Sequence, residues 1–203
     1  MHYLCNPRKK GLAQKIYIIA GCNGAGKTTA SFTILPQILQ CEEFVNADEI
    51  ARGLSPFHPE RVSIEAGRLM LGRISMLMKQ KSSFALETTL STRSYVSLIN
   101  KAHKAGYQVE LIFFWLASPE VAIQRVAKRV LEGGHDILED VIRRRYDAGI
   151  KNLFNIYGHV VDRWLLVDNN TGKSVVLAES NDGVTKIYDF ERFKRIMDYG
   201  LRQ

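Results

Sequence analysis

Short apolar stretches alternate along the chain with longer segments in which apolar residues recur every three or four positions. The short stretches are typical of buried strands, and the three- and four-residue spacing is typical of helices. The pattern predicts strands over residues 16–20, 44–46, 83–86, 108–116 and 163–167. It predicts helices that reach about residue 39, begin at Pro59, cover 93–105, run from 118 to the glycines at 133 and 134, and cover 138–157.

The strands are apolar on both faces, as the unbroken run Leu111–Trp115 shows. Such strands are typical of a parallel sheet that is covered by helices on both sides. We therefore predict an α/β fold. Within it, the helix from Pro59 is expected to bury one face that carries Ile64, Leu71, Ile74 and Met78.

The last part of the chain has shorter spacing between its apolar runs. Residues 174–178 and 184–188 are separated by an Asn-Asp-Gly turn sequence, which predicts a β-hairpin. A helix is expected from about Asp189. We expect a single domain over residues 1–203, with a core over about 15–170 and a C-terminal hairpin and helix over 171–203.

Composition places the chain among folded globular proteins, since 46% of its 203 residues are hydrophobic and 24% are charged. The longest apolar run, residues 111–117, is too short to span a membrane. Residues 1–15 lack the apolar segment of a secretory signal. Three widely spaced cysteines suggest neither a disulfide framework nor a zinc site. We therefore expect a cytoplasmic protein that does not bind membranes.

The strongest chemical signal is a phosphate-binding loop of the form G-x-x-x-x-G-K-[ST], which follows a predicted strand and opens a predicted helix. Its glycines allow backbone N–H groups to converge on phosphate oxygens. Lys27 is expected to reach the β- and γ-phosphates of ATP, and the Thr28 hydroxyl is expected to hold Mg²⁺. The predicted ATP-binding residues are Gly21, Cys22, Asn23, Gly24, Ala25, Gly26, Lys27, Thr28 and Thr29.

Two acidic positions follow predicted strands, where ligands bind in parallel α/β sheets. Asp48 could accept the proton of an acceptor hydroxyl, or it could cap a helix. Glu87 and Thr89 could bind hydroxyls, Glu87 could support a metal ion, or both could belong to an ordinary turn.

Several cations follow in the second half of the chain. Arg125 and Arg129 share one helix face, His135 follows two glycines, and an arginine run covers residues 143–145. Guanidinium groups beside a nucleotide can neutralise a phosphoryl group in transfer. At least one arginine of this set is expected to face phosphate, although solvated helix surface is the alternative for each.

These motifs, in this order, resemble the zeta-toxin-like P-loop kinases over about residues 15–170. The resemblance implies a P-loop kinase fold and ATP-dependent phosphorylation of the 3′-hydroxyl of the sugar in UDP-N-acetylglucosamine. It implies that Asp48 is the general base and that Glu87 and Thr89 hold the aminosugar. Ser91 stands where toxin members have an arginine. It also implies, if the protein is a toxin, a small helical antitoxin that blocks the nucleotide site.

The arginine pair of the toxins has no direct counterpart in this chain. Arg129 is the first choice for the catalytic arginine, and His135 is assigned near the position of the second. Arg125 and His135 are assigned to substrate binding. With Asp48 and Lys27, Arg129 completes the expected catalytic set.

Three alternatives remain. A P-loop kinase could instead act on a nucleoside, a nucleotide or an antibiotic. An ABC-type ATPase is suggested by Leu131–His135 and by the strand Trp164–Asp168, but Asn169 stands where the hydrolytic glutamate should follow. The net charge of +7 would also suit a nucleic-acid-binding module, although the basic residues are spread along the chain. A second loop-like sequence, Thr171–Ser174, lacks the upstream glycine and is expected to be a turn.

Overall fold

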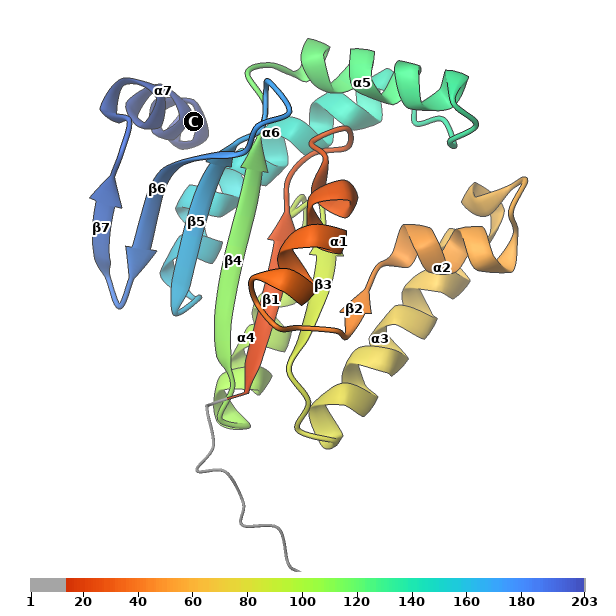
Figure 1. Ribbon diagram of the computed structural model, residues 1–203, viewed down its shortest axis with the longest axis horizontal. Coiled ribbons are helices and arrows are strands. Elements are labelled where there is room, and N and C mark those ends of the chain that lie inside the picture. The colour runs from red at the N-terminus through yellow and green to blue at the C-terminus, as the bar shows by residue number, and fades with distance from the viewer. Residues whose placement is uncertain (1–13, 203) are drawn as a thin grey trace, which may run out of the picture.

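Five parallel strands form the centre of the fold in the computed structural model, which describes residues 14–202. Their order is β2-β3-β1-β4-β5, so the first strand of the chain lies in the middle (Figure 1). All five run in the same direction, and their carboxyl ends therefore meet at one edge of the sheet. The strands are β1 (Lys15–Ala20), β2 (Phe44–Val45), β3 (Phe84–Thr88), β4 (Gln108–Trp115) and β5 (Arg163–Asp168).

Helices cover both faces of this sheet and confirm the predicted α/β architecture (Figure 1). In the view of Figure 1, α1 lies in front of the sheet, α4 and α6 lie behind it, and α5 crosses above the strand ends. The helices are α1 (Lys27–Gln37), α2 (Ala47–Leu54), α3 (Ser63–Lys79), α4 (Tyr95–Lys104), α5 (Pro119–Leu131), α6 (Glu139–Asn155) and α7 (Phe190–Leu201), with short 3₁₀ helices at Pro59–Val62 and Tyr157–His159.

The predicted C-terminal hairpin and helix are confirmed. Strands β6 (Val175–Asn181) and β7 (Val184–Ile187) pair antiparallel, and β6 also pairs antiparallel with β5. The hairpin turn places Asp182 and Gly183 at φ 48° and 80°. Two consecutive left-handed residues favour an Asp-Gly sequence, because this turn follows the twist of the strands it joins. The hairpin extends the sheet beyond β5, and within residues 14–202 the sheet has seven strands.

The face that α3 buries differs from the prediction. Ile64 and Leu71 are 73% and 60% exposed, and Ile74 is the fully buried member of the predicted set. The buried stripe consists of Ala66, Met70, Ile74 and Leu77. Apolar residues occur around most of this helix, so the spacing alone did not distinguish the stripe that faces the sheet. The helix also begins at Ser63, because residues 59–62 form a 3₁₀ turn instead of its first turn.

The core is continuous through the central strands. Strand β4 is buried from Val109 to Trp115, in agreement with its two apolar faces. No helix among residues 14–202 is long and apolar enough to cross a membrane. Most of the N-terminal segment in which no secretory signal is expected, including Cys5, lies outside the described residues.

Candidate active site

The loop between β1 and α1 has the geometry that phosphate binding requires. Gly24 and Gly26 adopt φ values of 77° and 81°, in the left-handed region that favours glycine. A Cβ atom on Gly24 would lie 2.7 Å from the Ala122 carbonyl oxygen, so a side chain is also excluded by space. Lys27 is the first residue of α1. The helix N-terminus and its free N–H groups therefore face the space above the loop, where an anion is stabilised.

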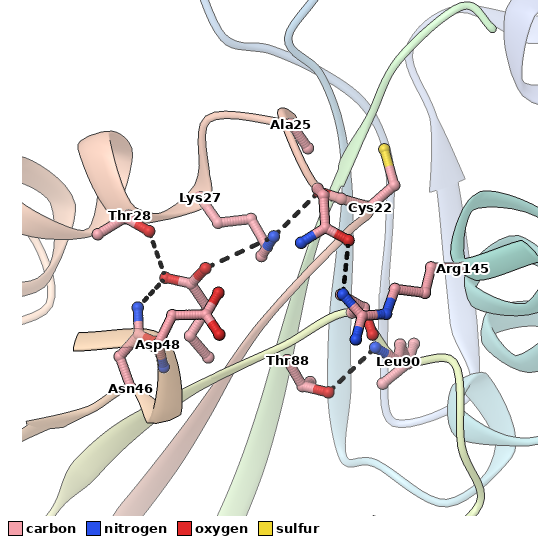
Figure 2. A network of polar contacts seen from close by, with 12 residues as sticks. Cys22, Ala25, Lys27, Thr28, Asn46, Asp48, Thr88, Leu90 and Arg145 are labelled. Atoms are coloured by element: carbon pink, nitrogen blue, oxygen red, sulfur yellow. Dashed lines mark hydrogen bonds and ion pairs between the residues drawn. The ribbon is translucent and has the colours of Figure 1, made fainter. Parts of the chain in front are cut away.

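Glu87 is the centre of a polar cluster at the end of β3, and the side chains of Lys27, Thr28 and Asn46 gather around it. Figure 2 shows these three side chains directed toward one another. Its carboxylate accepts hydrogen bonds from Thr28 Oγ1 at 2.8 Å and from Asn46 Nδ2 at 2.9 Å. Lys27 Nζ lies 3.5 Å from the other carboxylate oxygen and donates to the Cys22 carbonyl at 3.0 Å. Lys27 is 6% exposed, and a buried ammonium group requires such partners.

The contact between Glu87 and Thr28 bears on where a magnesium ion could bind. A carboxylate bonded to the hydroxyl of Thr28 lies where it can support a magnesium ion on that hydroxyl. In the described part of the chain, no group of three or more His, Cys, Asp or Glu residues could hold a metal ion. The Thr28 hydroxyl and the Glu87 carboxylate fit Mg²⁺, which proteins commonly bind through few side chains together with substrate phosphates.

Asp48 lies in the first turn of α2, and Asn46 occupies the cap position. The Asn46 side chain accepts a hydrogen bond from the Asp48 backbone N–H at 2.8 Å. The interpretation of Asp48 as a helix cap is therefore wrong, because the cap is Asn46, two residues earlier. Its carboxylate lines the cleft that also contains Lys27 and Arg145 (Figure 2), and Glu87 lines the same cleft.

Thr89 lines the same cleft, beside Thr88 and Tyr95. Its hydroxyl forms a hydrogen bond of 2.8 Å with the hydroxyl of Ser91. The structure therefore brings Thr89 together with Asp48 and Glu87. Thr88 and Thr89 thus both line this part of the cleft.

Arg125 braces the phosphate loop from α5. Its guanidinium donates to the carbonyl oxygens of Gly24, Asn169 and Asn170 at 3.5, 2.9 and 2.6 Å. These main-chain partners hold Arg125 beside the loop, in the part of the cleft that Thr29 and Glu132 also line. The position suits support of the nucleotide site better than the predicted contact with substrate.

Arg129 and His135 are coupled to each other at the end of α5. Arg129 Nη2 donates to the His135 carbonyl at 3.0 Å, and Arg129 Nε is buried with no hydrogen-bond partner in the described residues. His135 faces Asp48 and Glu60 across a further part of the cleft. Burial and the nearby Arg129 charge lower the pKa of His135, against an opposing effect of Asp48.

Arg145 is a cleft residue that the sequence did not single out from its run of three. It lies on α6 and donates to Asn23 Oδ1 of the phosphate loop at 3.0 Å (Figure 2). Helical spacing could have found it, because Arg145 is three residues after Ile142 and four before Gly149, which are both buried. Its neighbours Arg143 and Arg144 are exposed.

Two further residues that the sequence analysis named are placed by the structure. Asp168 ends the strand that suggested an ABC-type ATPase. Its carboxylate forms an ion pair with Arg192 at 2.9 Å. Cys22 is buried within the phosphate loop, and burial raises the pKa of its thiol to about 11. The thiol is therefore protonated at neutral pH and is not a nucleophile.

Comparisons with known proteins show which family the chain resembles. The family model described as zeta toxin matches residues 5–189. An uncharacterized protein of Haemophilus influenzae is 30% identical over 135 residues, which cover 66% of this chain and 94% of that protein.

Solved structures share the fold at lower sequence identity. The crystal structure of an AvrRxo1-ORF1:AvrRxo1-ORF2 complex with ATP has a TM-score of 0.75 at 19% identity, over 95% of this chain and 66% of that chain. The structure of the PezAT chromosomal toxin–antitoxin system of Streptococcus pneumoniae has a TM-score of 0.61 at 17% identity, over 96% of this chain and 87% of that chain. Because the zeta toxin match extends over most of the sequence, this chain belongs to the zeta toxin family of phosphotransferases.

Proposed function

We propose that the protein transfers the γ-phosphate of ATP to a hydroxyl group of a small acceptor, with Asp48 as the general base. The observation that carries this proposal is that Asp48, Lys27 and Arg145 line one cleft at the carboxyl end of the sheet. A base and the groups that bind phosphate thus face the same space. This is the arrangement that phosphoryl transfer needs, because the protein acts mainly by positioning and by stabilising charge.

The phosphate loop binds the nucleotide in this proposal. Its backbone N–H groups and Lys27 hold the phosphates, while Thr28, with Glu87 behind it, holds Mg²⁺. When bound, the magnesium ion neutralises charge on the β- and γ-phosphates. The bonds that Glu87 accepts from Thr28 and Asn46 support a role beside the metal more strongly than a role in holding an aminosugar.

Asp48 acts on the acceptor. Its carboxylate accepts the hydroxyl proton as the acceptor oxygen forms its bond to the γ-phosphorus and the bond to the β-phosphate oxygen breaks. The cap formed by Asn46 fixes the first turn of α2 and hence the position of this carboxylate.

Two arginines face the transferred group in this mechanism. Arg129 lines the part of the cleft with Thr28 and Thr29, and we keep it as a catalytic residue on the nucleotide side. Arg145 lines the two parts of the cleft that contain both Ala47 and Asp48, and we place it on the acceptor side. A guanidinium group in such a position stabilises the negative charge of the transferring phosphoryl group.

We propose UDP-N-acetylglucosamine as the acceptor, as the family resemblance implies. Thr89 and His135, which line the cleft on either side of Asp48, are the proposed sugar contacts. A nucleoside, nucleotide or antibiotic acceptor is the alternative within the same chemistry. We also propose an antitoxin as a partner, since the PezAT and AvrRxo1 structures are described as complexes or toxin–antitoxin systems.

Mass spectrometry tests the proposal directly. Purified protein incubated with Mg-ATP and UDP-N-acetylglucosamine is expected to add one phosphate to the sugar nucleotide. Asp48→Asn should lower this rate by about 10²- to 10⁴-fold and still bind ATP, because only the base is lost. Glu49→Gln is the matched control, since Glu49 is the next residue of α2 and pairs with Arg52 on its exposed side. Normal turnover by Asp48→Asn would refute the base assignment, and a nucleoside or antibiotic phosphorylated instead would correct the acceptor.

A further inference from the structure

Asn169, the residue after β5, packs its side chain directly against the phosphate loop. Its Nδ2 donates to the Ala25 carbonyl oxygen at 2.7 Å. The same nitrogen lies where a Cβ atom on Gly26 would come within 2.6 Å. Asn169 is 8% exposed, so this contact is shielded from water. A residue from the second half of the chain therefore holds the loop that binds nucleotide.

The Asn169 amide is itself fixed in one orientation. Ser174 Oγ donates to Asn169 Oδ1 at 3.0 Å, which leaves Nδ2 to face Ala25. The main chain is also held, because its N–H donates to the Trp115 carbonyl at 3.1 Å and its carbonyl accepts from Arg125. Both hydrogen-bonding ends of the side chain thus have partners, as a buried amide requires.

The hydrogen bond to the Ala25 carbonyl also fixes the direction of the Gly26 N–H group. The peptide between Ala25 and Gly26 is planar, and in a trans peptide the carbonyl and the N–H point in opposite directions. When Asn169 holds the carbonyl on one side, the N–H is fixed on the other. Gly26 caps α1, so its N–H belongs to the group that faces an anion at the helix N-terminus.

We propose that Asn169 is a positioning residue for nucleotide binding, which fixes the peptide plane between Ala25 and Gly26. The inference rests on the proposed function, because it takes the loop to bind ATP. It assigns a role to two sequence features that the mechanism does not use. The strand ending at Asp168 places Asn169, and the turn Thr171–Ser174 supplies the hydroxyl that orients its amide.

The dissociation constant of Mg-ATP, measured by isothermal titration calorimetry in the absence of any acceptor, tests this role. Asn169→Leu keeps a similar side-chain volume and removes the bond to Ala25, and we expect the Kd to rise about tenfold. Ser174→Ala should raise it by a smaller factor, because the amide loses only its orienting partner. Asn170→Ala is the matched control: the lost side chain bonds Asp168 and the Ala117 N–H and does not contact the loop, and the Asn170 main-chain carbonyl that accepts from Arg125 remains in the variant. Its Kd should stay within about twofold of wild type.

A second readout separates positioning from general destabilisation. Hydrogen exchange at the Gly26 amide in the ATP-bound protein should be faster in Asn169→Leu than in Asn170→Ala, while exchange in the central strands should be equal. If Asn169→Leu binds Mg-ATP as tightly as the control, the role of Asn169 is refuted and the proposed function stands. If the wild-type protein binds Mg-ATP but phosphorylates no acceptor, the proposed function fails and the role of Asn169 stands. If the wild type binds no Mg-ATP, both are overturned.

Discussion

Single side chains at the carboxyl end of the sheet divide the chemistry among themselves. Asn46 caps α2 and also donates to Glu87, so that Asp48 needs no structural partner for its carboxylate. Arg125 and Arg145 likewise differ in how many partners hold their guanidinium groups. The guanidinium of Arg125 is held by three main-chain carbonyls, whereas Arg145 donates to one neutral side chain and forms no ion pair within residues 14–202.

This difference predicts that Arg145 matters to turnover. Arg145→Ala should lower kcat by about a hundredfold or more, because a phosphoryl group in transfer loses a charged donor. Arg144→Ala, an exposed neighbour on the same helix, should leave kcat within about twofold. Steady-state kinetics with the identified acceptor measures both. Equal rates for the two variants would remove Arg145 from the mechanism.

At the scale of the element, α3 shows that an apolar residue on a helix need not face the core. Leu77 is 1% exposed and Leu71 is 60% exposed, although they lie on the same helix. Helix α3 packs against α2, the 3₁₀ turn and β2, and the periodicity of its apolar residues does not describe these contacts.

The two leucines give a matched test of this packing. Leu77→Ala should lower the free energy of unfolding by about 2–5 kcal/mol, since it leaves a cavity in the core. Leu71→Ala should change it by no more than about 0.5 kcal/mol. Urea denaturation monitored by circular dichroism compares the variants. A larger loss for Leu71→Ala would contradict the described helix face.

The sequence predicted the site residues that belong to a local motif or follow a strand. It did not predict contacts between segments that are far apart in the chain. The phosphate loop and its lysine were predicted because the motif is local. Asp48 and Glu87 were placed at one edge because parallel strands end together. Arg145 was not selected from its run of three, although its spacing from Ile142 and Gly149 places it on the buried side of α6. That spacing does not show that this side of the helix reaches Asn23. The contact between Asn169 and Ala25 joins residues 144 apart, and no local pattern indicates it.

At the scale of the whole molecule, pH should act on stability through His135. Burial and Arg129 lower its pKa below the ordinary value of 6.5. Between the lowered value and 6.5 the unfolded chain binds more protons than the folded chain, so stability falls as the pH falls through this window. Above the window His135 is neutral in both states and contributes no slope.

The variant His135→Gln isolates this effect. The free energy of unfolding, measured by urea titration between pH 7.5 and pH 5, should fall less steeply in the variant than in the wild type, because glutamine does not titrate. Other titrating groups act in both proteins and cancel in the comparison. Parallel curves would show that the environment of His135 is not the one described.

The antiparallel hairpin also determines which strand edge the described residues leave open. Within the described residues it moves one free edge of the sheet from β5 out to β7, and the other edge is the two-residue strand β2. An open edge is a template for pairing with a foreign strand, and β7 exposes the apolar residues Val184 and Ile187. Lys186 stands between them and projects a charge that opposes such pairing. The loss of this charge in Lys186→Val would leave an apolar open edge, at the rim of the sheet that lies far in sequence from the phosphate loop.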